Sequence, residues 1–386
     1  MSELLNGRWA ETKEALLEGL QGTKKSVMGV TLENTRKYLM ESPTAGATSA
    51  GNVATLNRVI LPVIRRVMPT VIANELVGVQ PLTGPVGQIN TLRVRYAENG
   101  NGAVAGEEAL SPFKIAEAYS GAANGKAAST ASLEGSAGSK LSIQLLKQTV
   151  EAKTRKLSAR WTFEAAQDAQ AQQGIDVEAE IMGALAQEIT AEIDQEILAS
   201  LSSLAGTASQ TYDQANVSGT ATFVGDEHAA LAIQINRVSN LIAQRTRRGP
   251  GNWAVVSPLA LTILQSATTS AFARTTEGTF EAPTNTKFVG TLNSAMKVYV
   301  NSYANDNTAV LVGYKGPSES DAAAFYCPYI PLMSSGVVLD PSTFEPTVSF
   351  MTRYGYVELS NTASSLGNAA DYLGKVAIAE GNVKFS

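Results

Sequence analysis

The sequence has few of the side chains that carry out chemistry, since its 386 residues include one histidine, His228, and one cysteine, Cys327. A single cysteine excludes an intramolecular disulfide framework and is typical of a reducing compartment. A nucleophilic pair would need both residues together, whereas a buried thiol and a capping or surface histidine are the favoured interpretation. Two such residues are too few for a cysteine–histidine metal site. We therefore expect no catalytic, cofactor-binding or metal-ligating residues.

Charged residues are also scarce, at 17% of the chain, where roughly a quarter is usual for a soluble domain. This shortage is typical of a protein whose surface becomes interface. The net charge of −5 excludes a global attraction for nucleic acid. No apolar run reaches the roughly 20 residues that span a bilayer, and the acidic N-terminus lacks the pattern of a secretion signal. We expect a soluble, cytoplasmically made protein that contacts no membrane.

Helical periodicity is present from the N-terminus. Residues 1–41 are predicted to form two helical segments, the second capped by Thr31. The small and polar stretch 42–52 is interpreted as a flexible link. Apolar pairs spaced by four residues predict a further helix that Pro62 and Pro69 bend or interrupt. These pairs are Val59/Ile60, Val63/Ile64, Val67/Met68 and Val71/Ile72.

A long two-stranded excursion is predicted over residues 88–163. Prolines and glycines stop any helix between Val79 and Gly87, and the chain alternates as a strand from Gln88 to Tyr96. Residues 99–139 are rich in Gly, Ala and Ser, and a loop of this length is usually functional or disordered. Strand-like and basic character returns from Leu141 to Phe163.

The longest helix is predicted over residues 176–204. Asp176 is a good N-cap, and Glu178 and Glu180 lie near the first turn, where the helix dipole favours negative charge. Apolar residues then recur every four positions, namely Ile181, Leu185, Ile189, Ile193, Ile197 and Leu201. Because an exposed helix does not tolerate such a stripe, we expect it to lie against the strand predicted at Thr347–Val357.

Shorter elements are predicted after this helix. An amphipathic helix covers Asp226–Arg247, and another covers Leu259–Ala267. Strands are predicted at Trp253–Ser257, Met296–Val300, Ala309–Tyr314, Ala323–Tyr329 and Thr347–Val357.

Several polar clusters favour ordinary structural roles. The acids Glu188, Glu192, Asp194 and Glu196 are interpreted as a solvated or interface-facing helix side rather than a cation site. The run from Asn305 to Asn307 lacks the later ligands of a calcium loop, so turn chemistry is favoured. Gly313 to Gly316 has no Walker spacing. Arg245 to Arg248 suit a helix end better than nucleic acid.

Two blocks of the sequence contain rare motifs in a fixed order, and these motifs resemble those of a known family. Val71 to Tyr96 has the sequence VIANELVGVQPLTGPVGQINTLRVRY, and MKVYVNSYA, VLVGYKG, FYCPYIPL, FEPTVSF and TRYG follow in order between Thr291 and Gly355. Both blocks resemble the major capsid proteins of tailed bacteriophages, in particular the contractile-tailed T-even class. The resemblance covers nearly everything from about Arg58 to Val357.

The resemblance implies an α+β protein with the Hong Kong 97-type phage capsid fold. Its parts would be an N-terminal arm (1–78), an extended β-hairpin loop (79–163), a peripheral domain with the long spine helix 176–204, and an axial domain (230–330). The peripheral domain would comprise residues 164–229 and 331–386.

The function implied is that of a major capsid protein. It would assemble into hexamers and pentamers of an icosahedral head enclosing double-stranded DNA, in the virion, after synthesis in the bacterial cytoplasm. Implied partners are the chain itself, a scaffolding protein, a maturation protease, and portal and decoration proteins, with only non-specific contact to DNA. The alternatives are a vertex protein of the same fold, an encapsulin-like shell, and an enzyme using Cys327 and His228.

Two further expectations concern assembly. Relatives in this family often lose the arm to a protease that cuts after Leu-x-Glu, for which Leu39-Met40-Glu41 is the candidate; we expect the arm to be retained. The distribution of basic residues also changes abruptly along the chain. Residues 161–236 contain no Lys or Arg, whereas six bases precede them, namely Lys140, Lys147, Lys153, Arg155, Lys156 and Arg160. We expect this basic strand to contact the acidic helix of a neighbouring subunit.

Overall fold

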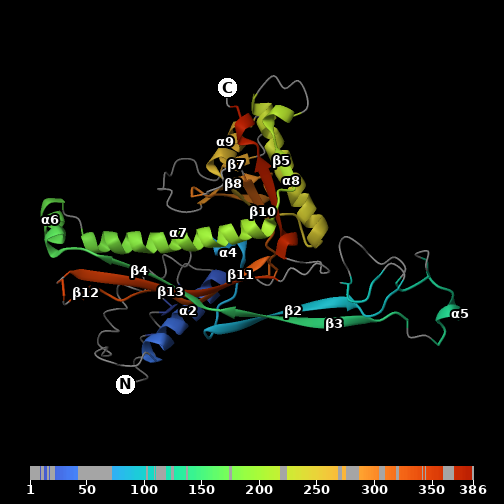
Figure 1. Cartoon of the computed structure of the whole chain (residues 1–386), viewed down its shortest axis with the longest axis horizontal. Helices are drawn as coiled ribbons and strands as arrows, with labels where there is room; N and C mark the ends of the chain where they lie inside the picture. Colours follow the sequence, from blue (N-terminus) through green and yellow to red (C-terminus); the bar gives the residue numbers. More distant parts are fainter. Residues whose placement is uncertain are drawn as a thin grey trace.

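The computed structural model contains two β-sheets, a long helix and a projecting hairpin (Figure 1). It describes residues 9, 13–14, 17, 22–41, 72–100, 103–107, 109, 119–122, 126–135, 138–173, 176–217, 224–267, 272–274, 287–303, 309–318, 321–340, 342–343, 345–359 and 369–384. The predicted link at 42–52, the predicted helix at 59–72 up to residue 71, and Asn305–Asn307 lie outside these residues. No described helix is long and apolar enough to cross a membrane.

A five-stranded sheet is built on the longest strand, β13 (Pro346–Glu358). Strand β11 (Ala324–Ser334) and the short β12 (Val338–Leu339) pair antiparallel with it on one edge. On its other edge lies β4 (Lys153–Arg160), also antiparallel. Strand β1 (Gly78–Val79) pairs parallel with β11. Along β13 the buried Val348, Phe350, Thr352 and Tyr354 alternate with more exposed residues, as a strand covered on one face requires.

The long helix α7 (Val177–Ala205) crosses one face of this sheet (Figure 1). Its N-cap is Asp176, whose side chain accepts from the amides of Glu178 and Ala179, as predicted. Leu185, Ile189, Ile193, Ile197 and Leu201 are buried, so the predicted packing of the apolar stripe onto β13 is confirmed. Helix α6 (Phe163–Gln173) precedes it and begins at Phe163, the last residue of the predicted strand.

Helix α2 (Gly22–Glu41) lies on the opposite face of the sheet from α7 (Figure 1). It buries Val27, Met28 and Leu32. The Asn34 amide donates to the carbonyls of Leu82 and Tyr329 at 2.7 and 3.0 Å. The predicted cap is wrong, because Thr31 lies inside this helix and its hydroxyl donates to the Met28 carbonyl.

The second sheet has seven strands and is covered by two helices. Its order is β5 (Gln210–Tyr212), β14 (Leu373–Ile378), β10 (Ala309–Gly313), β6 (Trp253–Val256), β9 (Met296–Val300), β8 (Lys287–Leu292) and β7 (Phe272–Arg274). Helix α8 (Val224–Thr246) approaches β14 at Gly374, where an added Cβ would lie 2.3 Å from the Val238 side chain. Helix α9 (Pro258–Ser266) lies against α8 and is capped by Ser257. Short 3-10 turns occupy Gln214–Asn216, Ala369–Tyr372 and Glu380–Asn382.

The hairpin consists of β2 (Val86–Tyr96) and β3 (Leu141–Glu151), paired antiparallel over eleven residues each. Figure 1 shows it extending away from both sheets. Near its far end Tyr96, Ala103, Ala109 and Tyr119 form a small buried cluster of their own. A short helix, α5 (Thr130–Leu133), lies in the loop between the strands.

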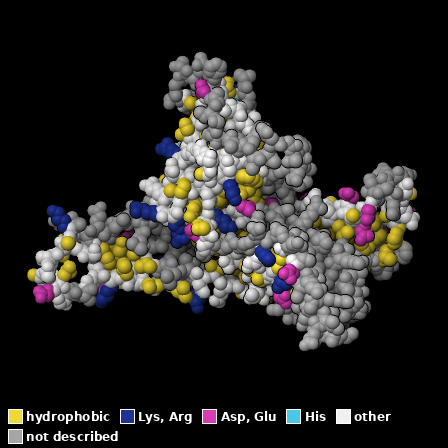
Figure 2. Space-filling model, turned by 180° about the vertical axis from the view of Figure 1, so that it is seen from behind, with side chains coloured by type: hydrophobic (Ala, Val, Ile, Leu, Met, Phe, Trp, Pro, Cys, Tyr) yellow, Lys and Arg dark blue, Asp and Glu magenta, His cyan; other side chains and the backbone are white. Residues whose placement is uncertain are grey.

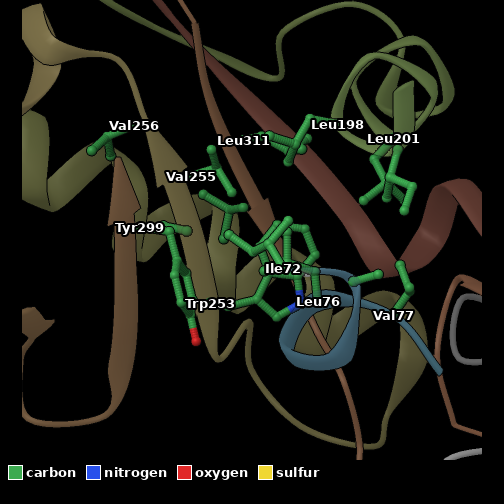
Figure 3. Packing of buried hydrophobic residues seen from close by; sticks show 14 of the residues in the cluster. Ile72, Leu76, Val77, Leu198, Leu201, Trp253, Val255, Val256, Tyr299 and Leu311 are labelled. Carbon is green, nitrogen blue, oxygen red and sulfur yellow. The ribbon is translucent and has the colours of Figure 1, made fainter. Parts of the chain in front are cut away.

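Helix α4 (Ala73–Leu76) joins the two sheets. Ile72, Leu76 and Val77 belong to the same buried cluster as Leu198 and Leu201 of α7 and Trp253 of β6 (Figure 3). The Lys315 ammonium donates to the Asn74 carbonyl at 2.8 Å. This four-residue helix is therefore a wedge between α7 and the seven-stranded sheet.

The α+β class and the order of arm, hairpin, long helix and second sheet are confirmed. Strand pairing, however, departs from the predicted domain limits at three places. Strand β4 was placed in the loop but pairs with β13 along its length. Residues 324–330 of β11, placed in the axial domain, pair with β13. Residues 210–212 and 373–378, placed in the peripheral domain, join the seven-stranded sheet. The pairings of β4 with β13 and of β5 and β10 with β14 join residues far apart in sequence, so local patterns do not indicate them.

Candidate functional site

The basic strand β4 has its charges on two faces, because successive side chains of a strand point in opposite directions. Arg155 points toward α7, where it meets Glu192 and Glu196. Lys156 is the next residue and is exposed on the other face. Arg160 shares that face and lies 3.7 Å from Glu345. Alternation therefore divides the basic run into two separate surfaces.

Arg155 is the centre of a charged cluster between α7 and the sheet. Its Nη1 donates to Glu192 at 2.6 Å and its Nη2 to Glu196 at 2.5 Å. Its Nε donates to the Tyr354 hydroxyl at 2.6 Å, and this hydroxyl donates to Glu196. One guanidinium thus bridges two turns of α7 to strand β13.

The cluster favours the charged forms of Arg155 and Glu196. Burial would raise the pKa of Glu196, but hydrogen bonds from Arg155 and Tyr354 outweigh burial and hold this pKa below its usual range. Burial would likewise lower the pKa of Arg155, but its hydrogen bonds to Glu196 and Tyr354 raise it. The four side chains of this cluster thus bind one another within one chain.

The expectation that the basic strand meets a neighbour's acids is therefore wrong for Arg155. Its partners Glu192 and Glu196 belong to the same chain. Glu178 and Glu188 are exposed on α7, as the solvated-helix interpretation requires. The sequence offered one signal for this cluster, since Glu192 and Glu196 are one turn apart and share a helix face.

Asp194 does not lie on the solvated side of α7 that was predicted for it and for its acidic neighbours. It is 1% exposed, and its Oδ1 accepts from the Ile72 amide at 3.0 Å. Its Oδ2 is buried without a hydrogen-bond partner among the described residues. Burial raises the pKa of Asp194 to about 7, and the Ile72 amide offsets only part of this rise. In the sequence, the position of Asp194 beside Ile193 and Ile197, within the apolar stripe, was the signal that could have indicated its burial.

The hairpin presents an apolar stripe on one face. Leu141, Ile143 and Leu145 alternate along β3 and are 55%, 70% and 52% exposed. The opposite face is buried at the base of the hairpin, where Val150 contacts a cluster containing Leu82 and Phe325. Figure 2 shows hydrophobic side chains along the hairpin, which extends to the left in that view. An exposed stripe of this kind marks an interaction surface.

A second exposed apolar surface lies at the other end of the molecule, around β12 (Figure 1). Val337, Val338 and Leu339 are 42%, 54% and 43% exposed. Exposed acids accompany this end, with Glu164 and Asp168 on α6. The hairpin exposes Lys140 and Lys147 together with Glu98 and Glu134. Both ends therefore expose apolar side chains, and charged side chains surround each of them.

The two candidate catalytic residues do not come together. His228 is 1% exposed and contacts Ser266 Oγ at 2.5 Å and the Lys384 carbonyl at 3.0 Å, so its expected surface position is wrong. Cys327 lies in β11, in a cluster with Leu82, Val150 and Phe325. Burial raises the pKa of its thiol to about 12, and the buried-thiol interpretation is confirmed.

The remaining polar motifs have structural partners. Arg248 pairs with Asp321, which also accepts from the Tyr372 hydroxyl, and Arg245 lies in the last turn of α8. The described residues contain no group of His, Cys, Asp or Glu that could hold a metal ion.

Comparison with known proteins identifies relatives along most of the chain. The family model "Major capsid protein Gp23" matches residues 53–136 and 116–378. The major capsid protein of Enterobacteria phage T4 is 30% identical over 81% of this chain and 76% of its own length. That of Vibrio phage KVP40 is 29% identical over 84% and 81%. Among solved structures, a chain of Mycobacterium phage Adephagia has a TM-score of 0.47 and 12% identity, covering 80% of this chain and 89% of its own.

Proposed function

Because the chain belongs to the major capsid protein Gp23 family, we propose that its hairpin lies over a neighbouring copy and holds hexamers and pentamers together. Members of this family are structural, so the chain is a self-associating subunit of a tailed-phage head, with the Hong Kong 97-type capsid fold, and not an enzyme. The observation that carries the proposal is the exposed apolar stripe Leu141, Ile143 and Leu145.

The two apolar ends of the molecule support a head-to-tail contact. Rings form when one surface of a subunit binds a different surface of the next and the rotation closes. The stripe on β3 and the surface around β12 lie at opposite ends of the molecule (Figure 1).

A charge on the stripe should prevent assembly without unfolding the subunit. We expect Ile143→Asp to give a folded, soluble protein that forms no shells, because Ile143 is 70% exposed and a carboxylate there would be desolvated only in the assembled state. Electron microscopy and sedimentation of the purified protein measure assembly, and circular dichroism measures folding.

Gln144→Asp is the matched control, since Gln144 is exposed on the opposite face of the same strand. We expect this variant to assemble as the unaltered protein does. Normal shells from Ile143→Asp would contradict the proposal, and so would equal loss of shells from both variants, because the stripe would then not be the determinant.

The proposal also includes partners other than the chain itself. A scaffolding protein, a maturation protease, and portal and decoration proteins would act with the shell in the bacterial cytoplasm, and packaged DNA would be contacted without sequence preference. The net charge of −5 supports weak rather than strong contact with DNA.

The arm should remain part of the subunit. Its helix α2 buries Val27, Met28 and Leu32 in the main core, and Asn34 ties it to the backbone at Leu82 and Tyr329. We expect intact-mass measurement on mature particles to find the N-terminal residues present. A product that starts at Ser42, after Leu39-Met40-Glu41, would overturn this expectation.

A further inference from the structure

Asp194 is a buried carboxyl at the joint between α7 and α4. One of its oxygens accepts the Ile72 amide at 3.0 Å, and the other has no hydrogen-bond partner among the described residues. The side chain is 1% exposed. A buried carboxylate in this position has lost its water and gained a single neutral donor, which is poor compensation for a charge.

Asp194 accepts a hydrogen bond from Ile72, the residue at which the chain enters α4. The N-cap of α4 is Ile72, and Ile72, Leu76 and Val77 pack into the main core beside α7 (Figure 3). The other described polar ties of α4 run to the seven-stranded sheet and its following loop, through Glu75 and the Asn74 carbonyl. Asp194 therefore supplies a polar contact of this joint on the α7 side.

Among the described residues, the surroundings of Asp194 contain titratable groups but no compensating cation. Tyr326 of β11 is close enough for the two groups to interact electrostatically. Glu196 of α7 and Tyr354 of β13 act on the same tyrosine, and Glu75 of α4 is hydrogen-bonded to β9. No lysine or arginine in the described part of the chain contributes to the pKa of Asp194.

The neutral form of the carboxyl fits this site better than the charged form. When protonated, Oδ1 still accepts from the Ile72 amide, and an unpaired hydroxyl costs less than an unpaired charge. When ionised, the group is stabilised by water, which reaches it only if a neighbouring segment moves. The helix α4 has four residues, against 29 in α7, so α4 is the segment that we expect to move.

We propose that Asp194 is a proton-operated latch, which seats the start of α4 on α7 when protonated and releases it when ionised. Burial raises the pKa of Asp194 from 3.8 to about 7 in the closed joint. The stabilisation of the closed joint by Asp194 is therefore complete below about pH 4, where its carboxyl is protonated in both the closed and the open joint. It is lost as the pH rises toward 7 and is constant above that value.

Hydrogen exchange across this pH range tests the latch. After correction for intrinsic exchange rates, we expect protection of residues 72–77 to fall between pH 5 and pH 7 by at most about tenfold per pH unit. Strand β10 should show no such fall. The measurement is made by mass spectrometry on the full chain, and equal pH profiles for the two segments in the unaltered protein would overturn the proposal.

Two variants assign the effect to Asp194. Asp194→Asn keeps an acceptor for the Ile72 amide and is neutral at every pH, so protection should no longer depend on pH and should exceed that of the unaltered protein at pH 7. Glu188→Gln removes an exposed acid from the same helix and should leave the profile unchanged. Asp194→Ser is the second neutral variant should Asp194→Asn misfold. A pH profile that persists in the neutral variant would overturn the assignment.

Discussion

Ile189→Asp should leave little folded protein and therefore no shells. Ile189 is 2% exposed in the middle of α7 and belongs to the main buried cluster. A carboxylate there would be buried without a partner, at a cost of more than about 4 kcal/mol. Because the free energy of unfolding of a domain is only about 5–15 kcal/mol, this one change removes a large part of the stability. Soluble yield, circular dichroism and urea denaturation measure the loss.

Gln187→Asp is the control for this experiment. Gln187 is exposed on the same helix, two residues earlier, so the variant introduces the same side chain without burying it. We expect its urea midpoint to stay close to that of the unaltered protein. A soluble, shell-forming Ile189→Asp variant would show that α7 does not rest on the sheet through its apolar stripe.

Arg155→Glu should destabilise the isolated subunit by about 2–4 kcal/mol, since it breaks a half-buried ion pair and adds a like charge. The new carboxylate would lie beside Glu192 and Glu196, which both bind Arg155 in the unaltered chain. Added salt should recover part of the loss by screening the repulsion. Urea denaturation at low and high salt measures both effects.

The pH dependence of this loss has a definite sign. Burial acts to raise the pKa of Glu196, but its hydrogen bonds to Arg155 and Tyr354 lower this pKa below its ordinary value of 4.5. The stability from this pair is therefore present above pH 4.5 and is lost as the pH falls through the lowered pKa. The difference between the two proteins should consequently shrink in acid.

Lys156→Glu is the matched control, because Lys156 is exposed on the opposite face of the same strand. We expect it to change the stability of the subunit by less than about 1 kcal/mol. Equal stability losses for Arg155→Glu and Lys156→Glu would mean that the cluster with α7 contributes nothing specific.

Elements whose signals are local could be predicted from the sequence. The cap of α7 at Asp176 and its apolar stripe lie in one continuous segment, and the structure has both. The strand Met296–Val300 is found with the predicted limits. The surroundings of Asp194 could not be predicted, because an acid among other acids suggests a solvated face, whereas its angular position beside Ile193 and Ile197 buries it.

The sequence by itself determined the family, the succession of helices and strands, and the scarcity of reactive side chains. Strand alternation even required Arg155 and Lys156 to point in opposite directions. Only the tertiary structure decided which of them meets α7, because that depends on the pairing of β4 with β13, about 190 residues later in the chain. It also decided that Cys327 and His228 stay apart and that Asp194 meets Ile72. Such contacts arise when distant segments bury their apolar faces together, and no local pattern records which segments those are.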